Sequence, residues 1–300
     1  MKQGYKCGYV ALIGKPNTGK STLMNALVGE KLSITADRPQ TTRHQILGIK
    51  TTDDYQSIFI DTPGIHDNNS KAIHRYMNRA AISMLDDSDL ICVLLDIRHY
   101  TEDDVKILQR VSRYSNVIVV LNKIDRVSKA ACLPVMKKIS EQVPGFDCVP
   151  VSALEKENLD RLEQVIISRL PEAVPQFPDD QLTDKSMRFI SAEIVREKLF
   201  RALTQELPYS ITVSVDHYLE ESDITRISAT IWVERKSQKA IVIGKKGSLL
   251  KKVGSLARAD IEHLISARVY LQLWVKIRED WADDEKSLAA FGYSDANQSH

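Results

Sequence analysis

The chain has 300 residues, of which 43% are apolar and 27% are charged, so it can bury an ordinary globular core and is not expected to be disordered. A chain of this length more often forms two domains than one. Its 41 Lys and Arg nearly balance its 40 Asp and Glu, and the formal net charge of +1 therefore identifies no class of partner. Only the distribution of charge along the chain can do that.

Cysteine, histidine and hydropathy patterns exclude several other classes of protein. The four Cys never approach a C-x-x-C spacing and the seven His form no zinc motif, so we expect reduced thiols and no structural zinc. The apolar stretch after the basic N-terminus runs into Gly14 without a cleavage site, which favours a strand over a signal peptide. Apolar runs reach about six residues, far below the roughly 18 of a membrane span. We therefore expect a soluble, cytoplasmic protein with no transmembrane segment.

Residues 8–170 alternate between short Val- and Ile-rich runs and stretches of helical period, which predicts an α/β domain with helices on both faces of a sheet. Asp53 and Asp54 form a turn signal between the second and third runs, so we expect one antiparallel pair in an otherwise parallel, six-stranded sheet. The expected strands are Gly8–Ile13, Ile46–Thr51, Gln56–Asp61, Asp89–Asp96, Asn116–Asn122 and Cys148–Ser152.

The segment Gly14–Ser21 reads G-K-P-N-T-G-K-S and fits the phosphate-binding pattern G-x-x-x-x-G-K-[ST], between the first expected strand and a helical pattern. Its glycines let backbone N–H groups surround a polyphosphate at a helix N-terminus, whose partial positive charge favours anions. Lys20 is expected to reach the β- and γ-phosphates, and Ser21 to bind Mg²⁺. Alone, the loop predicts a nucleotide phosphate without choosing adenine or guanine.

The tetrapeptide Asp61–Gly64, D-T-P-G, closes the third expected strand. Most such tetrapeptides are plain turns, but this one follows a phosphate loop in the order that a GTPase requires. Asp61 can hold Mg²⁺ through water, and Gly64 can offer its backbone N–H to the γ-phosphate. Between the first helix and the second strand, a switch loop needs a Thr that binds Mg²⁺, and Thr42 is the first choice and Thr41 the second.

The tetrapeptide Asn122–Asp125, N-K-I-D, lies at the carboxyl edge of the expected sheet, where α/β proteins bind ligands. Asp125 can accept from both N1–H and the 2-amino group of guanine, which adenine does not offer, so GTP is preferred over ATP. A polar helix cap is the alternative for a single N-x-x-D, but the other motifs favour base recognition. Ser152–Leu154 closes the sixth strand and resembles the last guanine-binding loop.

The predicted GTP site therefore draws on phosphate, switch and base segments. Its nucleotide-binding residues are Gly14, Lys15, Pro16, Asn17, Thr18, Gly19, Lys20, Ser21, Thr22, Asp61, Thr62, Pro63, Gly64, Ile65, Asn122, Lys123, Asp125, Ser152, Ala153 and Leu154. The predicted Mg²⁺ ligands are Ser21, Thr42 and Asp61, and the residues expected to carry catalysis are Lys20, Thr42 and Gly64.

Five motifs in this order resemble the translation-factor-like GTPase superfamily, and G-K-P-N-T-G-K-S, Q-T-T-R-H and D-T-P-G narrow the resemblance to its Era and TrmE branch. The resemblance implies a P-loop GTPase that binds GTP or GDP with Mg²⁺. Ile65 stands where Ras-type enzymes carry the glutamine that orients water, so hydrolysis is expected to be slow without help. Branch members with Asn at the position of Asn17 often use K⁺, which implies K⁺-stimulated turnover.

A change in composition and periodicity separates this region from a second domain. Residues 171–180 contain three Pro and three acidic residues without periodicity, which indicates a linker. Helical spacing over Ser186–Leu203 and period-two alternation at 211–215, 227–233 and 269–277 predict a smaller α+β domain. We therefore expect a GTPase domain over residues 1–170, a linker over 171–184 and a second domain over 185–300.

The second domain contains a G-x-x-G motif, Gly244–Gly247, after the apolar stretch Ile241–Ile243 and before the helical pattern Ser248–Ile265. KH domains clamp single-stranded RNA with such a loop. Eight Lys or Arg and no Asp or Glu lie between Arg235 and Arg258, which favours a nucleic-acid partner over a merely solvated basic helix face. The predicted RNA-binding residues are Gly244, Lys245, Lys246, Gly247, Lys251 and Lys252.

The order helix, strand, strand, G-x-x-G helices, strand resembles a type II KH domain, and the C-terminal residues around Trp281 resemble those of the Era family. The resemblance then spans essentially the whole chain. It implies binding near the 3′ end of small-subunit (16S) ribosomal RNA, assistance in maturation of the small ribosomal subunit, a monomer, and peripheral association with the cytoplasmic face of the inner membrane.

Two alternatives are weighed against this interpretation. Asn122 and Asp125 argue against a P-loop ATPase. Gly244, Gly247 and the acid-free basic run argue against a GTP-regulated module whose basic surface meets acidic proteins or anionic lipid. Trp274 lies off the main apolar stripe of its strand, so its role stays open between packing and base stacking.

Overall fold

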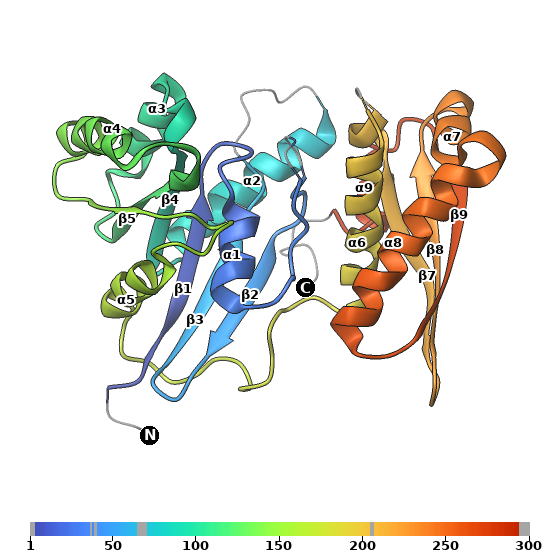
Figure 1. Cartoon of the computed structure of the whole chain (residues 1–300), viewed down its shortest axis with the longest axis horizontal. Coiled ribbons are helices and arrows are strands. Elements are labelled where there is room, and N and C mark those ends of the chain that lie inside the picture. The colour runs from blue at the N-terminus through green and yellow to red at the C-terminus, as the bar shows by residue number, and fades with distance from the viewer. Residues whose placement is uncertain (1–3, 37, 39–40, 65–70, 205–206, 294–300) are drawn as a thin grey trace. The chain divides into compact units, whose positions relative to one another are not determined.

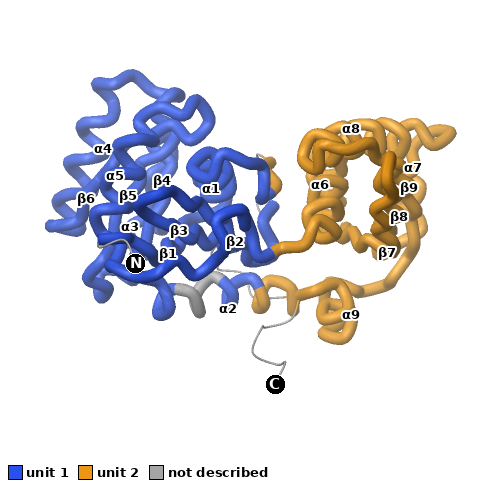
Figure 2. Tube along the Cα trace, turned by 90° about the horizontal axis from the view of Figure 1, so that it is seen from below, with its two compact units in different colours: residues 1–33, 37–68, 77–184 blue, residues 34–36, 69–76, 185–300 orange. Residues whose placement is uncertain are grey.

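The computed structural model describes residues 4–36, 38, 41–64, 71–204 and 207–293, with the backbone alone described for 81–84. The chain divides into two compact units (Figure 2). The first comprises residues 1–33, 37–68 and 77–184. The second comprises residues 185–300 together with two short segments from earlier in the chain, 34–36 and 69–76.

The first unit is built on a six-stranded sheet with the order β2-β3-β1-β4-β5-β6 (Figure 1). Its strands are β1 (Lys6–Ile13), β2 (Ile46–Thr51), β3 (Tyr55–Asp61), β4 (Leu90–Asp96), β5 (Val117–Asn122) and β6 (Asp147–Pro150). Strands β2 and β3 pair antiparallel and every other neighbouring pair is parallel. The predicted mixed, mostly parallel sheet is confirmed, and its strand ends differ from the expected ones by at most two residues.

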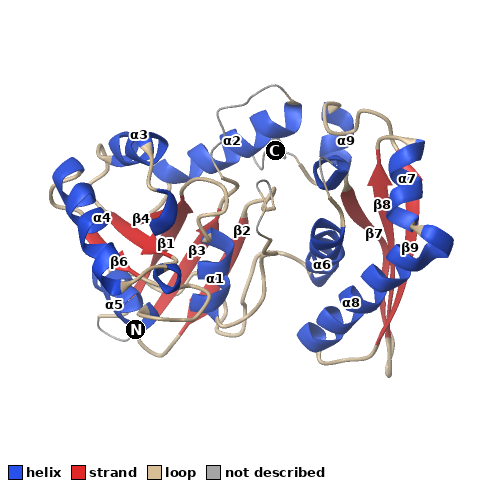
Figure 3. Ribbon diagram, turned by 45° about the horizontal axis from the view of Figure 1, so that its top comes forward, coloured by secondary structure: helices blue, strands red, loops and turns tan. Residues whose placement is uncertain are grey.

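Helices cover both faces of this sheet because its central strands are apolar on both sides (Figure 3). The helices are α1 (Lys20–Val28), α2 (Ala72–Asp86), α3 (Glu102–Val111), α4 (Lys129–Gln142) and α5 (Leu159–Arg169). Side chains of α2, α3 and α4 form one core with strand residues such as Val93 and Val119, which are fully buried. This packing fixes the carboxyl edge of the sheet, from which the phosphate loop and the base-binding tetrapeptide emerge.

Residues 171–184 lie against the first unit and have no helix or strand of their own beyond an isolated bridge between Lys6 and Glu172. The Gln56 side chain holds them: its Nε2 donates to Phe177 O at 2.8 Å, and its Oε1 accepts from Phe177 N at 3.0 Å. Farther on, Ile49 N donates to Leu182 O at 2.8 Å. The bond from Ile49 satisfies part of the open edge of β2.

The second unit contains a three-stranded sheet with the order β7-β8-β9. Its elements are α6 (Met187–Ala202), β7 (Thr212–Glu220), β8 (Thr225–Val233), α7 (Lys236–Ile243), α8 (Ser248–Ile265), β9 (Val269–Ile277) and α9 (Glu285–Ala290). Helices α6 and α8 pack against each other and cover one face of the sheet (Figure 3). The type II KH arrangement is confirmed, and the apolar stretch Ile241–Ile243 proves to be the last turn of α7.

Aromatic residues near the C-terminus close one end of the second unit. Trp281 is fully buried, and its Nε1 donates to Ser210 O at 3.1 Å. Its ring lies 6.1 Å from that of Tyr293, which contacts Tyr76 at the start of α2 at 5.9 Å. No helix in the described part of the chain is long and apolar enough to cross a membrane.

Candidate functional site

The phosphate loop connects the end of β1 to the start of α1, and two glycines fix its path. Gly14 has φ +145°, and a Cβ there would lie 2.4 Å from Leu94 O. Gly19 has φ +99°, and a Cβ there would lie 2.3 Å from Asn122 Nδ2. Both positions combine a left-handed backbone with close approach by another strand's residues, so only glycine fits. The N-terminus of α1 therefore opens onto the loop, as an anion site requires.

Lys20 begins α1 and is buried beneath this loop. Its Nζ donates to Gly14 O at 3.0 Å and to Lys15 O at 2.9 Å. Desolvation lowers the pKa of its ammonium group to about 8, although the Asp61 carboxylate opposes the shift. A phosphate beside Lys20 would stabilise the charged form and raise that pKa again.

The predicted Mg²⁺ ligands converge on the Asp61 carboxylate at the end of β3. Ser21 Oγ donates to Asp61 Oδ2 at 2.6 Å and lies 2.7 Å from Thr42 Oγ1. Ser33 Oγ donates to the same Asp61 oxygen at 2.7 Å. Thr41 Oγ1 instead donates to Arg38 O at 2.8 Å, so Thr42 is the threonine placed beside Ser21.

The same carboxylate supplies a test of whether a cation fits. Asp61 is fully buried, and its Oδ1 accepts no hydrogen bond from the described residues. Burial raises the pKa of Asp61, while hydrogen bonds from Ser21 and Ser33 lower it. An unsatisfied buried carboxylate oxygen beside two hydroxyl groups matches the hard oxygen ligands of Mg²⁺.

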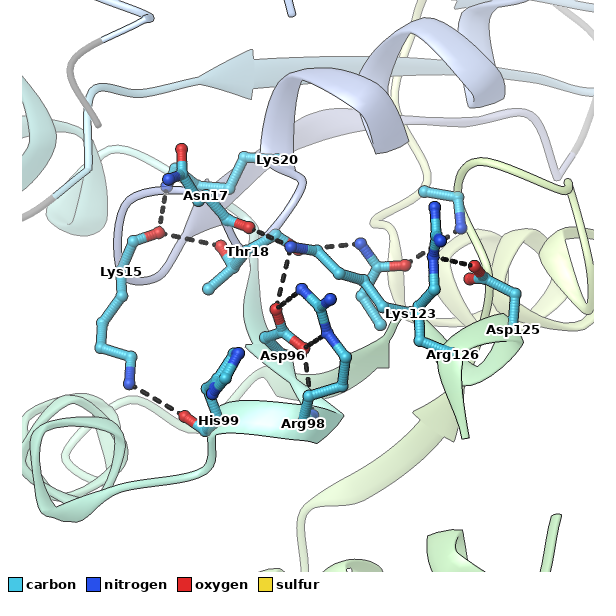
Figure 4. Close-up of polar contacts among 12 residues, drawn as sticks. Lys15, Asn17, Thr18, Lys20, Asp96, Arg98, His99, Lys123, Asp125 and Arg126 are labelled. Carbon is cyan, nitrogen blue, oxygen red and sulfur yellow. Dashed lines mark hydrogen bonds and ion pairs between the residues drawn. The ribbon is translucent and has the colours of Figure 1, made fainter. Parts of the chain in front are cut away.

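The base-binding tetrapeptide lies at the end of β5, next to the phosphate loop (Figure 4). Asn122 joins three segments: its Nδ2 donates to Thr18 O at 2.8 Å and its Oδ1 accepts from Ala153 N at 3.0 Å. Asp125 Oδ1 accepts from Ser152 Oγ at 2.6 Å, and its Oδ2 pairs with Arg126 Nε at 2.9 Å. The structure thus brings together the three segments predicted to recognise guanine.

Lys123 adds a contact with β4. It has a positive φ of 68°, and its Nζ pairs with Asp96 Oδ2 at 2.9 Å and donates to Asn17 O. Burial alone would raise the pKa of Asp96, but hydrogen bonds from Arg98 and Lys123 outweigh it and hold that pKa well below its usual range. Asp96 therefore stays charged and fixes the base-binding tetrapeptide against the phosphate loop (Figure 4).

The D-T-P-G segment approaches the phosphate loop through Gly64. A Cβ at Gly64 would lie 2.8 Å from Pro16 N, so glycine permits this close approach. Thr62 Oγ1 donates to Leu12 O at 2.8 Å and holds the segment against β1. Ile65 lies outside the described residues.

Three supporting residues were not predicted: Ser33, Asp96 and Asp104. Asp104 is buried, and its Oδ2 accepts from Lys15 Nζ at 2.6 Å, which ties the phosphate loop to α3. The pattern Thr101-x-x-Asp104 forms a capping box at the start of α3, so sequence could have located the helix end but not its contact with Lys15. Asp96 had a weaker signal, as an acid at the carboxyl end of an apolar strand.

In the second unit, the G-x-x-G loop joins α7 to α8. Gly244 has φ +75°, and a Cβ there would lie 2.8 Å from Leu249 Cβ. Gly247 has φ +78° and faces open space, with nothing within 4 Å of an added Cβ. The four predicted RNA-binding lysines, Lys245, Lys246, Lys251 and Lys252, are all exposed. The loop therefore offers an open, basic backbone surface next to the N-terminus of α8.

The fold and these two sites define a P-loop GTPase domain joined to a KH domain. A family model described as 50S ribosome-binding GTPase matches residues 9–123, and a KH domain model matches residues 206–282. GTPase Era of Pseudomonas aeruginosa is 48% identical over 294 residues, which cover 97% of this chain and 96% of the relative. GTPase Era of Azotobacter vinelandii is 46% identical over 97% of this chain and 98% of the relative. The chain belongs to the GTPase Era family.

Two solved structures resemble the whole chain. One is a Tyr-to-Ala variant of Aquifex aeolicus Era bound to GDP and AlF4⁻, with a TM-score of 0.93, 39% identity, and coverage of 96% of this chain and 99% of that one. The other is Era in complex with MgGDPNP and nucleotides 1506–1542 of 16S ribosomal RNA, with a TM-score of 0.93 and 39% identity, covering 97% and 99%.

Proposed function

We propose that this protein is a GTP-binding and GTP-hydrolysing switch that binds small-subunit (16S) ribosomal RNA near its 3′ end and assists maturation of the small ribosomal subunit. The observation that carries the proposal is that one chain holds the segments suited to phosphate, Mg²⁺ and guanine side by side and also has an open, basic G-x-x-G loop. The related Era bound to MgGDPNP and a 16S fragment supports it.

Each part of the nucleotide has residues suited to it. Lys20 and backbone N–H groups of the non-proline residues of the phosphate loop hold the phosphates, and Gly64 meets the γ-phosphate. Asp125 accepts from guanine, with Ser152 orienting its carboxylate. Adenine lacks both donors and would leave this acceptor unpaired, so GTP is selected over ATP.

Mg²⁺ fits at Asp61, Ser21 and Thr42. Bound there, it would neutralise charge that develops on the phosphate oxygens. Ser21 and Thr42 supply hydroxyl ligands, and Asp61 supplies the carboxylate that they now surround. Thr42 lies in the predicted switch loop, so its position would report whether the γ-phosphate is present.

Slow intrinsic turnover follows from the sequence at Ile65, because an apolar side chain there cannot orient the attacking water. K⁺ stimulation is a further part of the proposal, implied by Asn17. It is tested by steady-state GTP turnover in matched KCl and NaCl: higher turnover in KCl is expected, and equal rates contradict it.

GTP-dependent control of RNA binding is proposed to run through the first switch segment. Thr35 N donates to Glu197 Oε1 at 3.1 Å, and Arg201 Nη2 donates to Thr35 O at 3.0 Å, both within the second unit. Two residues earlier, Ser33 is bonded to Asp61. Two residues separated by one position are thus held by the predicted Mg²⁺ carboxylate and by α6. Reordering of residues 33–43 by GTP and Mg²⁺ would therefore reach the KH domain.

The test is a titration of a labelled RNA from the 3′ end of 16S ribosomal RNA with the full chain, in GTP analogue and in GDP. We expect tighter binding with the analogue, and about tenfold weaker binding when Lys245 and Lys246 are both changed to Ala, because phosphate contacts are lost. Undiminished binding by that variant at low salt would overturn the assignment of the G-x-x-G loop.

The alternative of a GTP-regulated module for protein or membrane binding is separated in the same experiment. Sedimentation with vesicles of anionic lipid measures peripheral membrane association, which we propose as a secondary property. If the double variant loses vesicle binding while its RNA affinity is unchanged, the basic surface is a lipid site and the assignment of the G-x-x-G loop to RNA fails.

A further inference from the structure

The sheet of the second unit presents one face that none of the described helices covers along most of its length. Alternate residues such as Ile227, Ala229 and Ile231 point into the core with α6 and α8. The cross-strand register places the intervening residues on the opposite side, which we call the open sheet face. Its members are Arg226, Ser228, Thr230 and Trp232 on β8 and Tyr270, Gln272, Trp274 and Lys276 on β9.

Two large aromatic side chains on this face are half exposed. Tyr270 is 51% exposed and Trp274 is 52% exposed, both on β9. They lie four residues apart on one side of the strand, a spacing of about 13 Å. Trp232 on β8 is different, because Phe291 lies 5.5 Å from it and Ser214 Oγ accepts from its Nε1 at 2.9 Å. Trp232 is therefore packed, whereas Tyr270 and Trp274 present ring surface to a ligand.

Cations flank the aromatic rings across the sheet. Arg226 is the register partner of Tyr270, and its guanidinium carbon lies 5.6 Å from the ring centroid. Lys276 is the register partner of Trp232, and its Nζ lies 5.6 Å from that ring. The acidic groups on this side are engaged: Asp216 accepts from Thr230, and Glu221 pairs with Arg226. Rings bordered by positive charge suit bases joined by phosphates.

The position of β9 connects this face to the G-x-x-G loop. Strand β9 is the edge of the sheet, and its other face packs against α7 and α8, the helices that flank Gly244–Gly247. An RNA strand that leaves the loop can cross this edge and reach Tyr270 and Trp274. Other sheet proteins use aromatic residues on strands to stack two or three unpaired bases.

We propose that the open sheet face is a second RNA contact, in which unpaired bases beyond those held at the G-x-x-G loop stack on Tyr270 and Trp274. The inference rests on the proposed RNA-binding function and extends it. It also assigns Trp274, which the sequence left between packing and stacking. The G-x-x-G loop clamps about four nucleotides, so the second contact concerns RNA longer than that.

The test measures how the affinity of the full chain for short and long RNAs changes when Tyr270 or Trp274 is substituted. A four-nucleotide and a ten-nucleotide single-stranded RNA from the 3′ end of 16S ribosomal RNA are titrated by fluorescence anisotropy. Trp274→Ala and Tyr270→Ala are each expected to weaken binding of the longer RNA about tenfold and to leave the short RNA within about twofold. Trp274→Phe keeps a ring and is expected to retain most of the affinity.

Leu133→Ala is the matched control, because Leu133 is 69% exposed on α4, an element of the first unit and not of this sheet. It should bind both RNAs like the wild type. Failure of the wild type to bind either RNA would defeat the proposed function itself. Binding of both RNAs with no effect of Trp274→Ala or Tyr270→Ala overturns only the second contact. A concentration-dependent dimer that Trp274→Ala abolishes, without loss of RNA affinity, also overturns it and assigns the face to a second copy of the chain.

Discussion

The nucleotide site and the G-x-x-G loop differ in how their polar groups are held. Lys20, Asp61 and Asn122 are at most 6% exposed and are bonded to neighbouring segments, so the site is shaped by the fold itself. Lys245 and Lys246 are exposed on a short loop. Buried groups that are held in place discriminate between ligands, whereas exposed lysines attract phosphate without reading sequence. Specificity for guanine and attraction for RNA therefore have different physical origins in one chain.

The largest expected effect comes from Gly19→Ala, which tests whether the nucleotide site depends on close packing. A methyl group there would lie 2.3 Å from Asn122 Nδ2 and displace the amide that holds Thr18 and Ala153. Because misplacement on the order of 1 Å can cost about 100-fold in activity, we expect kcat/KM for GTP to fall by about that factor. Steady-state phosphate release measures it.

Gly29→Ala is the control for backbone strain alone. Gly29 has φ +95°, close to that of Gly19, but an added Cβ would meet nothing within 4 Å. We expect a loss of about 1 kcal/mol of stability and kcat/KM within about threefold of the wild type. Equal losses of activity in the two variants would show that strain, and not the Asn122 contact, sets the effect.

Substitutions of the two glycines in the G-x-x-G loop are expected to have smaller effects than Gly19→Ala. Only one of these two glycines is closely packed. Gly244→Ala would place a methyl group 2.8 Å from Leu249 Cβ, whereas Gly247→Ala meets open space. Gly244→Ala should therefore lower the thermal midpoint of the second unit by several degrees. Gly247→Ala carries only the strain of its positive φ, about 1 kcal/mol as at Gly29, so it should lower the midpoint less than Gly244→Ala does. It should weaken RNA binding about tenfold, since its open space is where the RNA backbone approaches.

Differential scanning calorimetry and RNA titration distinguish these outcomes, and GTP affinity serves as the internal control in both variants. If Gly247→Ala binds RNA like the wild type while Gly244→Ala loses binding only through unfolding, the loop is structural. The loop would then not be an open RNA-binding site, and its contrast with the packed nucleotide site would be wrong.

The difference between the regions also explains what sequence could predict. The phosphate loop and the strands followed from local pattern, because G-x-x-x-x-G-K-[ST] and apolar runs depend on neighbouring residues. The bonds from Ser33 to Asp61 and from Lys15 to Asp104 did not, since they join residues brought together only by tertiary packing. Short apolar runs do not separate strand from helix, so the sequence does not assign the last turn of α7 to either.

The choice between Thr41 and Thr42 as the Mg²⁺ ligand likewise cannot be made from sequence pattern. Both lie in a loop, where no hydrophobic period fixes which side chain points inward. The structure places the Thr42 hydroxyl 2.7 Å from Ser21 Oγ and turns that of Thr41 towards Arg38 O. A prediction that rests on a motif can thus name the segment, while the ligand atom depends on packing.

The smallest expected effect concerns the buried charge of Lys20. It tests whether burial of this residue controls nucleotide affinity. Its pKa is lowered to about 8, and a bound phosphate favours the ammonium form, so nucleotide binding takes up a proton when the pH exceeds that value. From the fraction of Lys20 that is charged, GDP affinity should fall about fourfold between pH 7 and pH 8.5. Titrations with a fluorescent GDP analogue measure the slope.

Loss of folding cannot imitate this decline. A Lys whose pKa is lower in the folded state than its unfolded value of 10.5 makes the ligand-free fold more stable as the pH rises from about 8 towards 10.5. Lys20→Arg keeps its charge throughout the range and should bind GDP more weakly but with a nearly flat pH profile. If GDP affinity falls with pH equally in the wild type and in Lys20→Arg, the titrating group is not Lys20. Burial of Lys20 then does not control phosphate binding.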